Sequence, residues 1–413
     1  MYPHRTSNWR TVSWCAECLC RRRHRIWGRI VPQGNVKRGF FALAEKEVLL
    51  VFGTRPEAIK MCPLVLELKR RGHMNVKVCV TGQHREMLQQ VLHTFGVVPD
   101  YDLHVMKEGQ DLYDVTSRVL LGMRDILVQE KPDVVLVHGD TSTAFAACLA
   151  AFYAHVPVGH VEAGLRTYDL ESPYPEEYNR QAIGISARWH FAPTQAAREH
   201  LLREGKDPAR IYVTGNTGID ALQTTVRPDY SHPELDWARD SRLLVITAHR
   251  RENLGQPMRE MFRAIRRIAE DFPNVKAVYP IHLNPLVRQI AAEELQGCDS
   301  IHLIEPLPAE DFHNFLKRSY LILTDSGGIQ EEAPALGKPV LVMRNTTERP
   351  EGVAAGTLKL TGTGEAAIYS ACRTLLEDPE AYRLMAQAKN PYGDGTASRQ
   401  IVDILERELH AQA

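Results

Sequence analysis

The sequence predicts an α/β protein made of two Rossmann-like, doubly wound domains, and two observations lead to this prediction. From residue 46 onward, short apolar runs alternate with longer amphipathic stretches, which is typical of parallel sheets that carry helices on both faces. A polar connector that contains Pro228 and Pro233 interrupts this alternation of apolar and amphipathic segments. The alternation then resumes, so one domain follows another. We expect domains at residues 45–222 and 223–388, and a C-terminal helix within 389–413 that packs back on the first domain.

The first domain should hold buried strands that each lead into a turn or a helix. "VLLVFG" begins at Val48 and precedes the helical stretch "AIKMCPLVLELKRRG", and "VKVCVTG" then precedes "HREMLQQVLHTFG". "PDVVLVHGD" and "ARWHFAPT" repeat the buried strand. These runs are apolar throughout rather than alternating, as expected where both faces of a parallel sheet are covered.

The second domain restarts the same pattern after residue 240. Its apolar runs are "RLLVITAHR", "VKAVYPIH", "SIHLIEPL", "YLILTDSGG" and "KPVLVMR". In such sheets ligands bind beyond the carboxyl ends of the strands, and two facing sheets leave a cleft between the domains. The polar motifs follow strands, so we expect the functional site in this interdomain cleft.

Composition excludes several classes of function. The 413 residues carry a formal net charge of −1, and residues 1–44 alone carry about +8, which leaves a mildly acidic body. An acidic body argues against nucleic acid as a partner. No apolar run is long enough to span a membrane, and the eight cysteines are scattered, so we expect a reduced, cytoplasmic protein without a membrane partner.

The first 44 residues are expected to be a disordered basic extension without a role in the function. "CAECLC" offers a C-x-x-C pair that could hold zinc, but no second pair of ligands follows at a suitable spacing. Strand periodicity begins only at "KEVLLVFG". We therefore expect no metal site here.

The turn "FGTRPEAIK" follows the first strand of the first domain. Gly53 permits a tight turn, Pro56 suits the first position of a helix, and Arg55 and Lys60 lie close to the free N–H groups of that helix. This arrangement suits a phosphate, although an ordinary strand-to-helix turn with solvated charges remains the alternative. The dinucleotide pattern G-x-G-x-x-G and the Walker A pattern are absent from the sequence.

Three acidic residues follow strands of the first domain and should converge. Asp140 lies in "HGDTST", Glu162 in "GHVEAGLRT" and Glu176 in "SPYPEEYNR". Carboxylates that share a cleft can divide acid and base roles when their environments separate their pKa values. For Asp140 alone, the competing interpretation is a helix N-cap.

The second domain opens with "ITAHRREN", which places His249 and Arg250 where a strand meets a helix. A histidine there could polarise or protonate a leaving oxygen, and the arginine could neutralise a phosphate. Helix capping by the histidine is the alternative.

The stretch "LTDSGGIQEE" predicts a seat for a pyrophosphate. Ser326, Gly327 and Gly328 have no bulk that would block the start of the following helix. Glu332 lies one turn further and could bind the hydroxyl groups of a ribose, and Arg349 adds charge from the next strand end. The predicted ligand is a nucleoside diphosphate joined to a hydroxyl-rich group.

Taken together, these motifs resemble the non-hydrolysing UDP-N-acetylglucosamine 2-epimerases of bacteria. The resemblance runs from about residue 47 to the C-terminus and includes "HGDTST", "GHVEAGLRT", "AHRREN", "LTDSGGIQEEAPALGKPVLVMRNTTERPEG" and "NPYGDG" in the same order. It implies the glycosyltransferase-B arrangement of two domains, a homodimer, and no cofactor or metal. It also implies interconversion of UDP-N-acetylglucosamine and UDP-N-acetylmannosamine, through anti elimination of UDP to 2-acetamidoglucal and its re-addition.

The resemblance assigns roles to individual residues of this sequence. The residues implied for catalysis are Asp140, Glu162, Glu176 and His249. Those implied for binding the UDP-sugar are Arg55, Lys60, Phe312, Ser326, Gly327, Gly328, Glu332 and Arg349. A second UDP-N-acetylglucosamine that acts as an activator would contact Gln83, Gln110, Glu176, Arg250 and His282. Gly109 stands where relatives often carry arginine, so one cationic contact of that second site is missing.

Three other functions share parts of this pattern. A glycosyltransferase of the same build would bind UDP similarly but needs an acceptor site, and a hydrolysing epimerase would release free UDP. A UDP-sugar sensor without catalysis could keep the glycine turn and lose the acids. The cluster of Asp140, Glu162 and Glu176 favours proton transfer at carbon.

Overall fold

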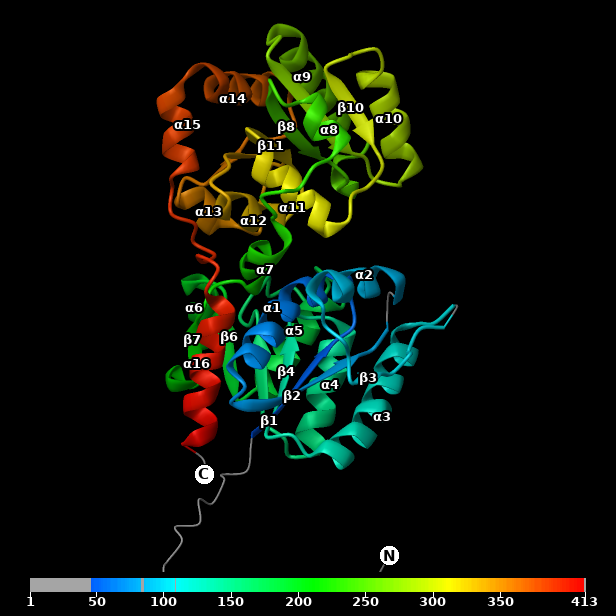
Figure 1. Ribbon diagram of the computed structural model, residues 1–413, viewed down its shortest axis with the longest axis vertical. Coiled ribbons are helices and arrows are strands. Elements are labelled where there is room, and N and C mark those ends of the chain that lie inside the picture. Colours follow the sequence, from blue (N-terminus) through cyan, green and yellow to red (C-terminus); the bar gives the residue numbers. More distant parts are fainter. Residues whose placement is uncertain (1–45, 83–84, 108, 412–413) are drawn as a thin grey trace, which may run out of the picture. The chain divides into compact units, whose positions relative to one another are not determined.

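The computed structural model describes residues 46–82, 85–107 and 109–411, apart from the side chains of residues 85 and 86. The predicted extension at 1–44 and the predicted activator residue Gln83 lie outside the described residues. The prediction of an α/β fold is confirmed, because the described residues form two parallel sheets with helices between the strands (Figure 1).

Within the described residues, the first sheet has seven strands in the order β3-β2-β1-β4-β5-β6-β7, and all neighbouring strands are parallel. Its strands are β1 (Lys46–Phe52), β2 (Met74–Val80), β3 (Tyr101–Asp102), β4 (Val134–His138), β5 (Val158–Val161), β6 (Trp189–Ala192) and β7 (Ile211–Val213). Its helices are α1 (Arg55–Arg71), α2 (Arg85–Phe95), α3 (Leu112–Glu130), α4 (Ser142–Tyr153), α5 (Glu176–Ser186), α6 (Gln195–Arg203) and α7 (Thr217–Thr225).

The second sheet repeats this topology with six described strands in the order β10-β9-β8-β11-β12-β13, again all parallel. Its strands are β8 (Arg242–Thr247), β9 (Val275–Pro280), β10 (Ile301–Ile304), β11 (Leu321–Thr324), β12 (Val340–Val342) and β13 (Leu358–Leu360). The helices that follow α7 in sequence are α8 (Pro233–Trp237), α9 (Gln256–Asp271), α10 (Pro285–Leu295), α11 (Ala309–Arg318), α12 (Ile329–Ala335), α13 (Pro350–Ala354), α14 (Glu365–Glu377), α15 (Pro379–Ala386) and α16 (Ala397–His410), of which α16 returns to the first sheet.

The strand order creates one switch point in each sheet, where the chain changes the direction in which it adds strands. In the first sheet this point lies between β1 and β4, and in the second between β8 and β11. Ligands of open α/β sheets bind beyond the carboxyl ends of strands at such points. The predicted motifs that contain Lys60, Asp140, His249 and Gly327 follow these four strands.

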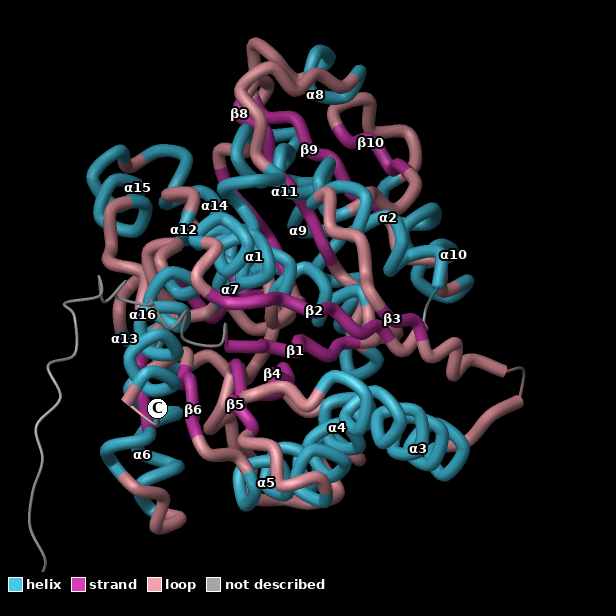
Figure 2. Tube along the Cα trace, turned by 60° about the horizontal axis from the view of Figure 1, so that its bottom comes forward, coloured by secondary structure: helices cyan, strands magenta, loops and turns pink. Residues whose placement is uncertain are grey.

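The apolar strands are buried because helices cover both faces of each sheet. In the first sheet, one core packs α1, α2 and α16 against the strands, and the other packs α3, α4 and α5 against the opposite face. Figure 2 shows α3, α4 and α5 side by side and away from α1 and α7. This explains the runs without alternation in β1 and β4, where both faces of the strand contact apolar side chains.

Helix α16 belongs to the core of the first sheet although it follows the second sheet in sequence. Its residues Ile401, Val402 and Leu405 are buried in the same core as α1, and Figure 1 shows the helix beside β6. Asp220 of α7 accepts hydrogen bonds from the backbone N–H groups of Ala397 and Ser398 and fixes the start of α16. The boundary near residues 222 and 223 stays a prediction.

None of the helices in the described ranges is both long enough and apolar enough to cross a membrane.

The first sheet buries two adjacent histidines, and this predicts acid sensitivity. His160 of β5 donates from Nε2 to the carbonyl oxygen of Gly139 at 2.7 Å and is the register partner of His190 of β6. Burial lowers the pKa of His160 to about 3, from an ordinary value of 6.5. As the pH falls below 6.5, the unfolded chain therefore binds a proton that the folded chain excludes until about pH 3.

We expect this histidine to cost about 2 kcal/mol of the free energy of unfolding between pH 7 and pH 5. Urea unfolding measured at both pH values should show a smaller loss for His160→Gln than for the wild type. The exposed His93 provides the control, because His93→Gln should leave the pH dependence unchanged. An equal loss in wild type and His160→Gln would contradict the prediction.

Candidate functional site

The turn after β1 is organised by a buried carboxylate. Thr54 caps α1, and Glu57 accepts hydrogen bonds from the backbone N–H groups of Gly53 at 3.0 Å and Thr54 at 2.7 Å. Glu57 also accepts a hydrogen bond from the hydroxyl of Thr141, at 2.7 Å, and so ties this turn to the one after β4. The two motifs at the first switch point are therefore joined.

Lys60 extends from α1 to Glu162, which directly follows β5. Its Nζ donates to Oε2 of Glu162, and Nε2 of His138 lies 3.2 Å from the same oxygen. Burial alone would raise the pKa of Glu162, but Lys60 and His138 outweigh it and hold that pKa well below its ordinary value. Glu162 also has a φ of 63°, a left-handed conformation that is rare for a residue with a side chain and occurs at functional sites.

Asp140 lies between β4 and α4 and is not a helix cap. The cap of α4 is Thr141, whose hydroxyl accepts from the N–H of Ala144 at 3.0 Å, so the capping interpretation of Asp140 is wrong. Oδ2 of Asp140 lies 2.6 Å from Nη2 of Arg180. Burial nevertheless raises the pKa of Asp140, with the charge of Glu162 adding to the rise and that of Arg180 opposing it.

The two glutamates at the start of α5 differ in their surroundings. Glu176 is half-buried, and its charge contributes to the raised pKa of Asp140. Glu177 is fully buried and accepts hydrogen bonds from the backbone of Thr167 and Tyr168, at 3.0 and 3.1 Å. Glu177 thus holds the loop that precedes α5, whereas Glu176 belongs electrostatically to the carboxylate group around Asp140.

At the second switch point, the turn after β8 is built around Asp325, which follows β11. Oδ2 of Asp325 accepts hydrogen bonds from the backbone N–H groups of His249 and Arg250, both at 2.9 Å. The ring of His249 stacks on that of His282, with centroids 5.4 Å apart. Burial lowers the pKa of His249, and the charge of Asp325 opposes this shift.

The glycine turn after β11 is open and flanked by two arginines. Helix α12 begins at Ile329 and is only seven residues long, and its N-cap Gly328 provides no side-chain cap, as predicted for an unobstructed helix start. A Cβ built on Gly327 would lie 3.7 Å from Nη2 of Arg250 and 3.7 Å from Nη2 of Arg349. Two guanidinium groups therefore converge on the space above Gly327, which suits an anion with several oxygens.

Glu331 connects the two switch points through buried side chains. It accepts from Nε of Arg349 and from Nδ2 of Asn216, and the same amide nitrogen lies 3.3 Å from Oε2 of Glu162. Lys60, Glu162, Asn216, Glu331 and Arg349 thus form one chain of charged and polar contacts, which we call the buried charge chain. It joins residues of both sheets.

Glu332, one position further along α12, faces other partners. Its Oε2 lies 3.5 Å from Nε2 of His313 on α11, and His313 in turn bonds the hydroxyl of Thr225 at 2.8 Å. Burial would raise the pKa of Glu332, but His313, Lys60 and Arg55 lower it below its ordinary value. Phe312, the predicted uracil contact, is half-buried next to His313. The predicted substrate residues Arg55 and Glu332 therefore interact electrostatically.

The predicted activator residues are only partly brought together. His282 and Arg250 lie beside His249. Gln110 lies in the segment before α3, where its Oε1 accepts from the N–H of Lys107 at 2.9 Å and from Nη1 of Arg118 at 3.3 Å. No contact joins Gln110 to the other predicted activator residues that the structure describes.

Reasoning from the sequence missed four residues of this site: Glu57, Asn216, Asp325 and Glu331. Glu57, Asp325 and Glu331 lie within motifs quoted above and Asn216 lies just before α7, but none has a residue type or spacing that identifies its partner. Their roles depend on contacts with distant segments. The described ranges contain no group of three or more histidine, cysteine, aspartate or glutamate side chains suited to hold a metal ion.

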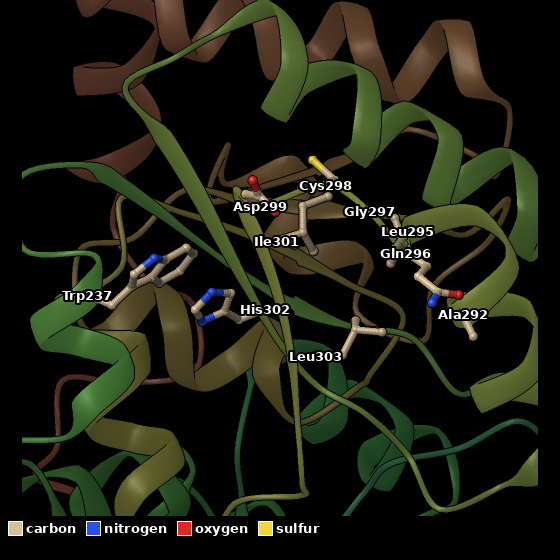
Figure 3. Close-up of a pocket in the computed structure, with 10 residues that line it drawn as sticks. All are labelled: Trp237, Ala292, Leu295, Gln296, Gly297, Cys298, Asp299, Ile301, His302 and Leu303. Carbon is tan, nitrogen blue, oxygen red and sulfur yellow. The ribbon is translucent and has the colours of Figure 1, made fainter.

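A cavity of about 710 Å³ lies elsewhere, at the outer edge of the second sheet beside β10 (Figure 3). The rings of Trp237 and His302 stack there with centroids 3.6 Å apart. None of the predicted site residues lines this cavity. A second cavity of about 630 Å³ is lined by Arg55, by residues of α2 and by residues 308–311.

The fold and the site together define an α/β protein of two parallel sheets, with a group of carboxylates beside one switch point and two converging arginines at the other. A family model described as UDP-N-acetylglucosamine 2-epimerase matches residues 66–406. The UDP-N-acetylglucosamine 2-epimerase of Bacillus subtilis is 59% identical over 359 residues, which cover 87% of this chain and 94% of that protein. The chain belongs to the UDP-N-acetylglucosamine 2-epimerase family, whose members are isomerases.

Two solved structures show the same fold. The UDP-N-acetylglucosamine 2-epimerase of Neisseria meningitidis, solved with UDP-N-acetylglucosamine bound, is 48% identical and superposes with a TM-score of 0.78, covering 87% of this chain and all of that one. The S. aureus protein MnaA, solved with UDP, is 51% identical with a TM-score of 0.81, covering 88% of this chain and 97% of that chain.

The ion pair of Lys60 and Glu162 generates a direct prediction. Replacing Lys60 by Met removes the main charge that opposes burial, so the pKa of Glu162 should rise by more than one unit. Carboxyl ¹³C NMR of glutamate-labelled protein, with Glu162→Gln to identify the signal, measures this pKa. The exposed Lys69 on the same helix is the matched control, and Lys69→Met should leave the signal unchanged. An unshifted titration in Lys60→Met would contradict the prediction.

Proposed function

We propose that this chain carries out its family's epimerisation by eliminating UDP from UDP-N-acetylglucosamine and adding UDP back to C1 after the configuration at C2 has been inverted. In the elimination the C2–H bond breaks, its electron pair forms the C1=C2 bond of 2-acetamidoglucal, and the C1–O pair leaves on the diphosphate. In the addition, C2 takes a proton on its other face and UDP re-forms the bond to C1. The observation that carries this proposal is the pair Asp140 and Glu162, whose pKa values are moved in opposite directions.

The opposite shifts of the two pKa values support different roles for Asp140 and Glu162. Glu162 is held ionised by Lys60 and His138 and would accept the proton from C2 of UDP-N-acetylglucosamine. Asp140, whose protonated form is favoured by burial, would donate a proton to C2 from the opposite face. In the reverse direction the two exchange roles, and Glu176 supports the protonated state of Asp140 through its charge.

The anion seat supports UDP as the leaving group. The converging guanidinium groups of Arg250 and Arg349 would bind the diphosphate above Gly327, and Glu332 would bind the ribose hydroxyls. The relatives solved with UDP and with UDP-N-acetylglucosamine agree with this ligand. His249 would face the oxygen that leaves C1. The remaining proposed UDP-sugar contacts are Arg55, Lys60, Phe312, Ser326 and Gly328.

Three further properties belong to this proposal. The chain would work in the cytoplasm, in keeping with the five free cysteines found among the described residues. A second UDP-N-acetylglucosamine would act as activator near Arg250 and His282, where it could act on His249 through the ring stack. The third property is a homodimer, formed through the apolar surface of α3, α4 and α5.

Proton NMR in D2O tests the reaction. Purified protein given UDP-N-acetylglucosamine should form UDP-N-acetylmannosamine to a plateau, with deuterium at C2 of both sugars and little free UDP. Stoichiometric release of UDP would instead identify a hydrolysing epimerase, and an unchanged C2 signal would point to transfer or binding without catalysis. A sigmoidal dependence of rate on substrate would support the activator, and a hyperbolic one would contradict it.

Asp140→Asn should lower kcat about 10³-fold while changing the Kd for UDP less than threefold, because it keeps the shape of the side chain and removes its acid–base function. Stopped assays and calorimetric titration with UDP measure the two quantities. Equal losses of turnover and of UDP affinity would show that Asp140 serves binding rather than proton transfer.

Gly327→Ala should weaken UDP binding at least tenfold, because the added methyl group would lie between the two guanidinium groups and occupy the anion seat. The folded structure should tolerate it, since 3.7 Å is an ordinary contact distance. Gly364→Ala, whose methyl group would lie 3.8 Å from Glu260, is the control and should bind UDP normally. An unchanged affinity for UDP in Gly327→Ala would show that the diphosphate does not bind above Gly327.

Exposed apolar side chains on three adjacent helices support the homodimer. Leu121 and Val128 of α3, Phe152 of α4 and Ile185 of α5 are more than half exposed, and burying such a patch is a common reason for association. Sedimentation should find a dimer in the wild type and a monomer for Leu121→Glu with Ile185→Glu. Leu384→Glu on α15, also exposed, is the control and should stay dimeric.

A further inference from the structure

Asp325 is a fully buried carboxylate whose two oxygens have different surroundings. Oδ2 accepts three hydrogen bonds, from the backbone N–H groups of His249 and Arg250 and from Nδ2 of Asn253 at 3.2 Å. These bonds fold the turn after β8 onto the end of β11. They account for one oxygen only.

The other oxygen, Oδ1, is buried without a hydrogen-bond partner among the described residues. A buried carboxylate oxygen in this state is costly, so a donor is expected close by. The nearest cationic candidate is Nδ1 of His249, which lies 3.5 Å away. This distance is longer than an ordinary hydrogen bond, as is common for catalytic contacts before a ligand binds.

The contact fixes which ring nitrogen of His249 is available. With Nδ1 turned to Asp325 and one ring face stacked on His282, Nε2 is the nitrogen left for a ligand. A neutral ring that carries its single N–H on Nδ1, facing Asp325, has only a lone pair on Nε2. A ring protonated on both nitrogens presents an N–H from Nε2 while Asp325 balances its charge.

We propose that Asp325 is a positioning residue that holds His249 through Nδ1 and stabilises its doubly protonated form, so that Nε2–H faces the diphosphate oxygen leaving C1. The inference rests on the proposed function. As the C1–O bond breaks, the electron pair that collects on this oxygen accepts the hydrogen bond from Nε2. Asp325 takes no proton in the step, and the hydrogen bond weakens again when the oxygen re-forms its bond to C1.

The charges around His249 are consistent with this role. Burial, His282 and Arg250 all disfavour the protonated ring, and Asp325 favours it. A bound diphosphate would add negative charge on the other side of the ring. Asp325 and the ligand would together produce the imidazolium that burial opposes.

Asp325→Asn tests the proposal, because the amide can still accept from the turn but would present N–H groups to Nδ1. ¹⁵N NMR of labelled histidine should show the neutral wild-type ring protonated at Nδ1 and the neutral variant ring protonated at Nε2. In the UDP complex, the pKa of His249 should fall by at least one unit in the variant. The basic limb of the kcat profile should move to lower pH, and kcat at pH 7 should fall about 10- to 100-fold.

A matched control separates positioning from folding of the turn. Asn253→Ala removes another hydrogen bond to the same carboxylate without changing its charge. It should lower the melting temperature but leave the tautomer and the pKa of His249 as in the wild type. A double variant with His249→Gln should show no further loss from Asp325→Asn, because Asp325 acts through His249.

The outcomes distinguish this inference from the proposed function. If Asp325→Asn does not fold, the wild-type tautomer alone decides, and a neutral ring protonated at Nε2 overturns the proposal. If the wild type epimerises but the variant keeps its kcat and the pKa of His249, the positioning role is wrong and the function stands. If the wild type neither epimerises nor exchanges C2–H, the function fails, while the NMR measurements still report on the contact.

Discussion

The buried charge chain from Lys60 through Glu162, Asn216 and Glu331 to Arg349 is the constraint on which the site depends. Its ions are largely removed from water, and a buried ion without a partner costs several kcal/mol. The buried charge chain is therefore stable only while the residues that the two sheets contribute to it stay together. Lys60, the first member of this chain, also lowers the pKa of Glu162 together with His138, so the joint between the sheets and the proposed acid–base chemistry share one residue.

The parallel strand order explains why so few segments build the site. In both sheets the chain reverses the direction in which it adds strands at a central pair. The ends of β1, β4 and β5 in one sheet and of β8 and β11 in the other therefore bring the carboxylates, the histidine and the glycine turn to two small areas. Asp140 and Glu162 follow the neighbouring strands β4 and β5, yet they differ in environment. Burial prevails at Asp140, and two cationic or ionisable partners prevail at Glu162.

The sequence was sufficient to predict the fold class and the strands that the polar motifs follow, because both depend on local runs of residues. It could not predict the partners within the site. Lys60 and Glu162 are 102 positions apart, and Asn216 and Glu331 are 115 positions apart. Neighbouring carboxylates also diverge: Glu331 and Glu332 are separated by about 100° around a helix, so one joins the charge chain and the other contacts His313. Packing therefore decides which partners each of two adjacent glutamates contacts.

The return of α16 to the first sheet means that the chain passes between the sheets twice. One passage runs through α7 and the other through residues 387–396, and they meet where the N–H of Asn216 donates to the carbonyl oxygen of Tyr392 at 2.8 Å. Gly215 and Gly393 are in contact there, and a Cβ on Gly215 would lie 3.0 Å from that oxygen. The two passages also contact each other further along, since Nε2 of Gln223 donates to the carbonyl oxygen of Gly395 at 2.6 Å and Tyr392 packs on Ile219 and Leu222. Each crossing of the chain therefore braces the other.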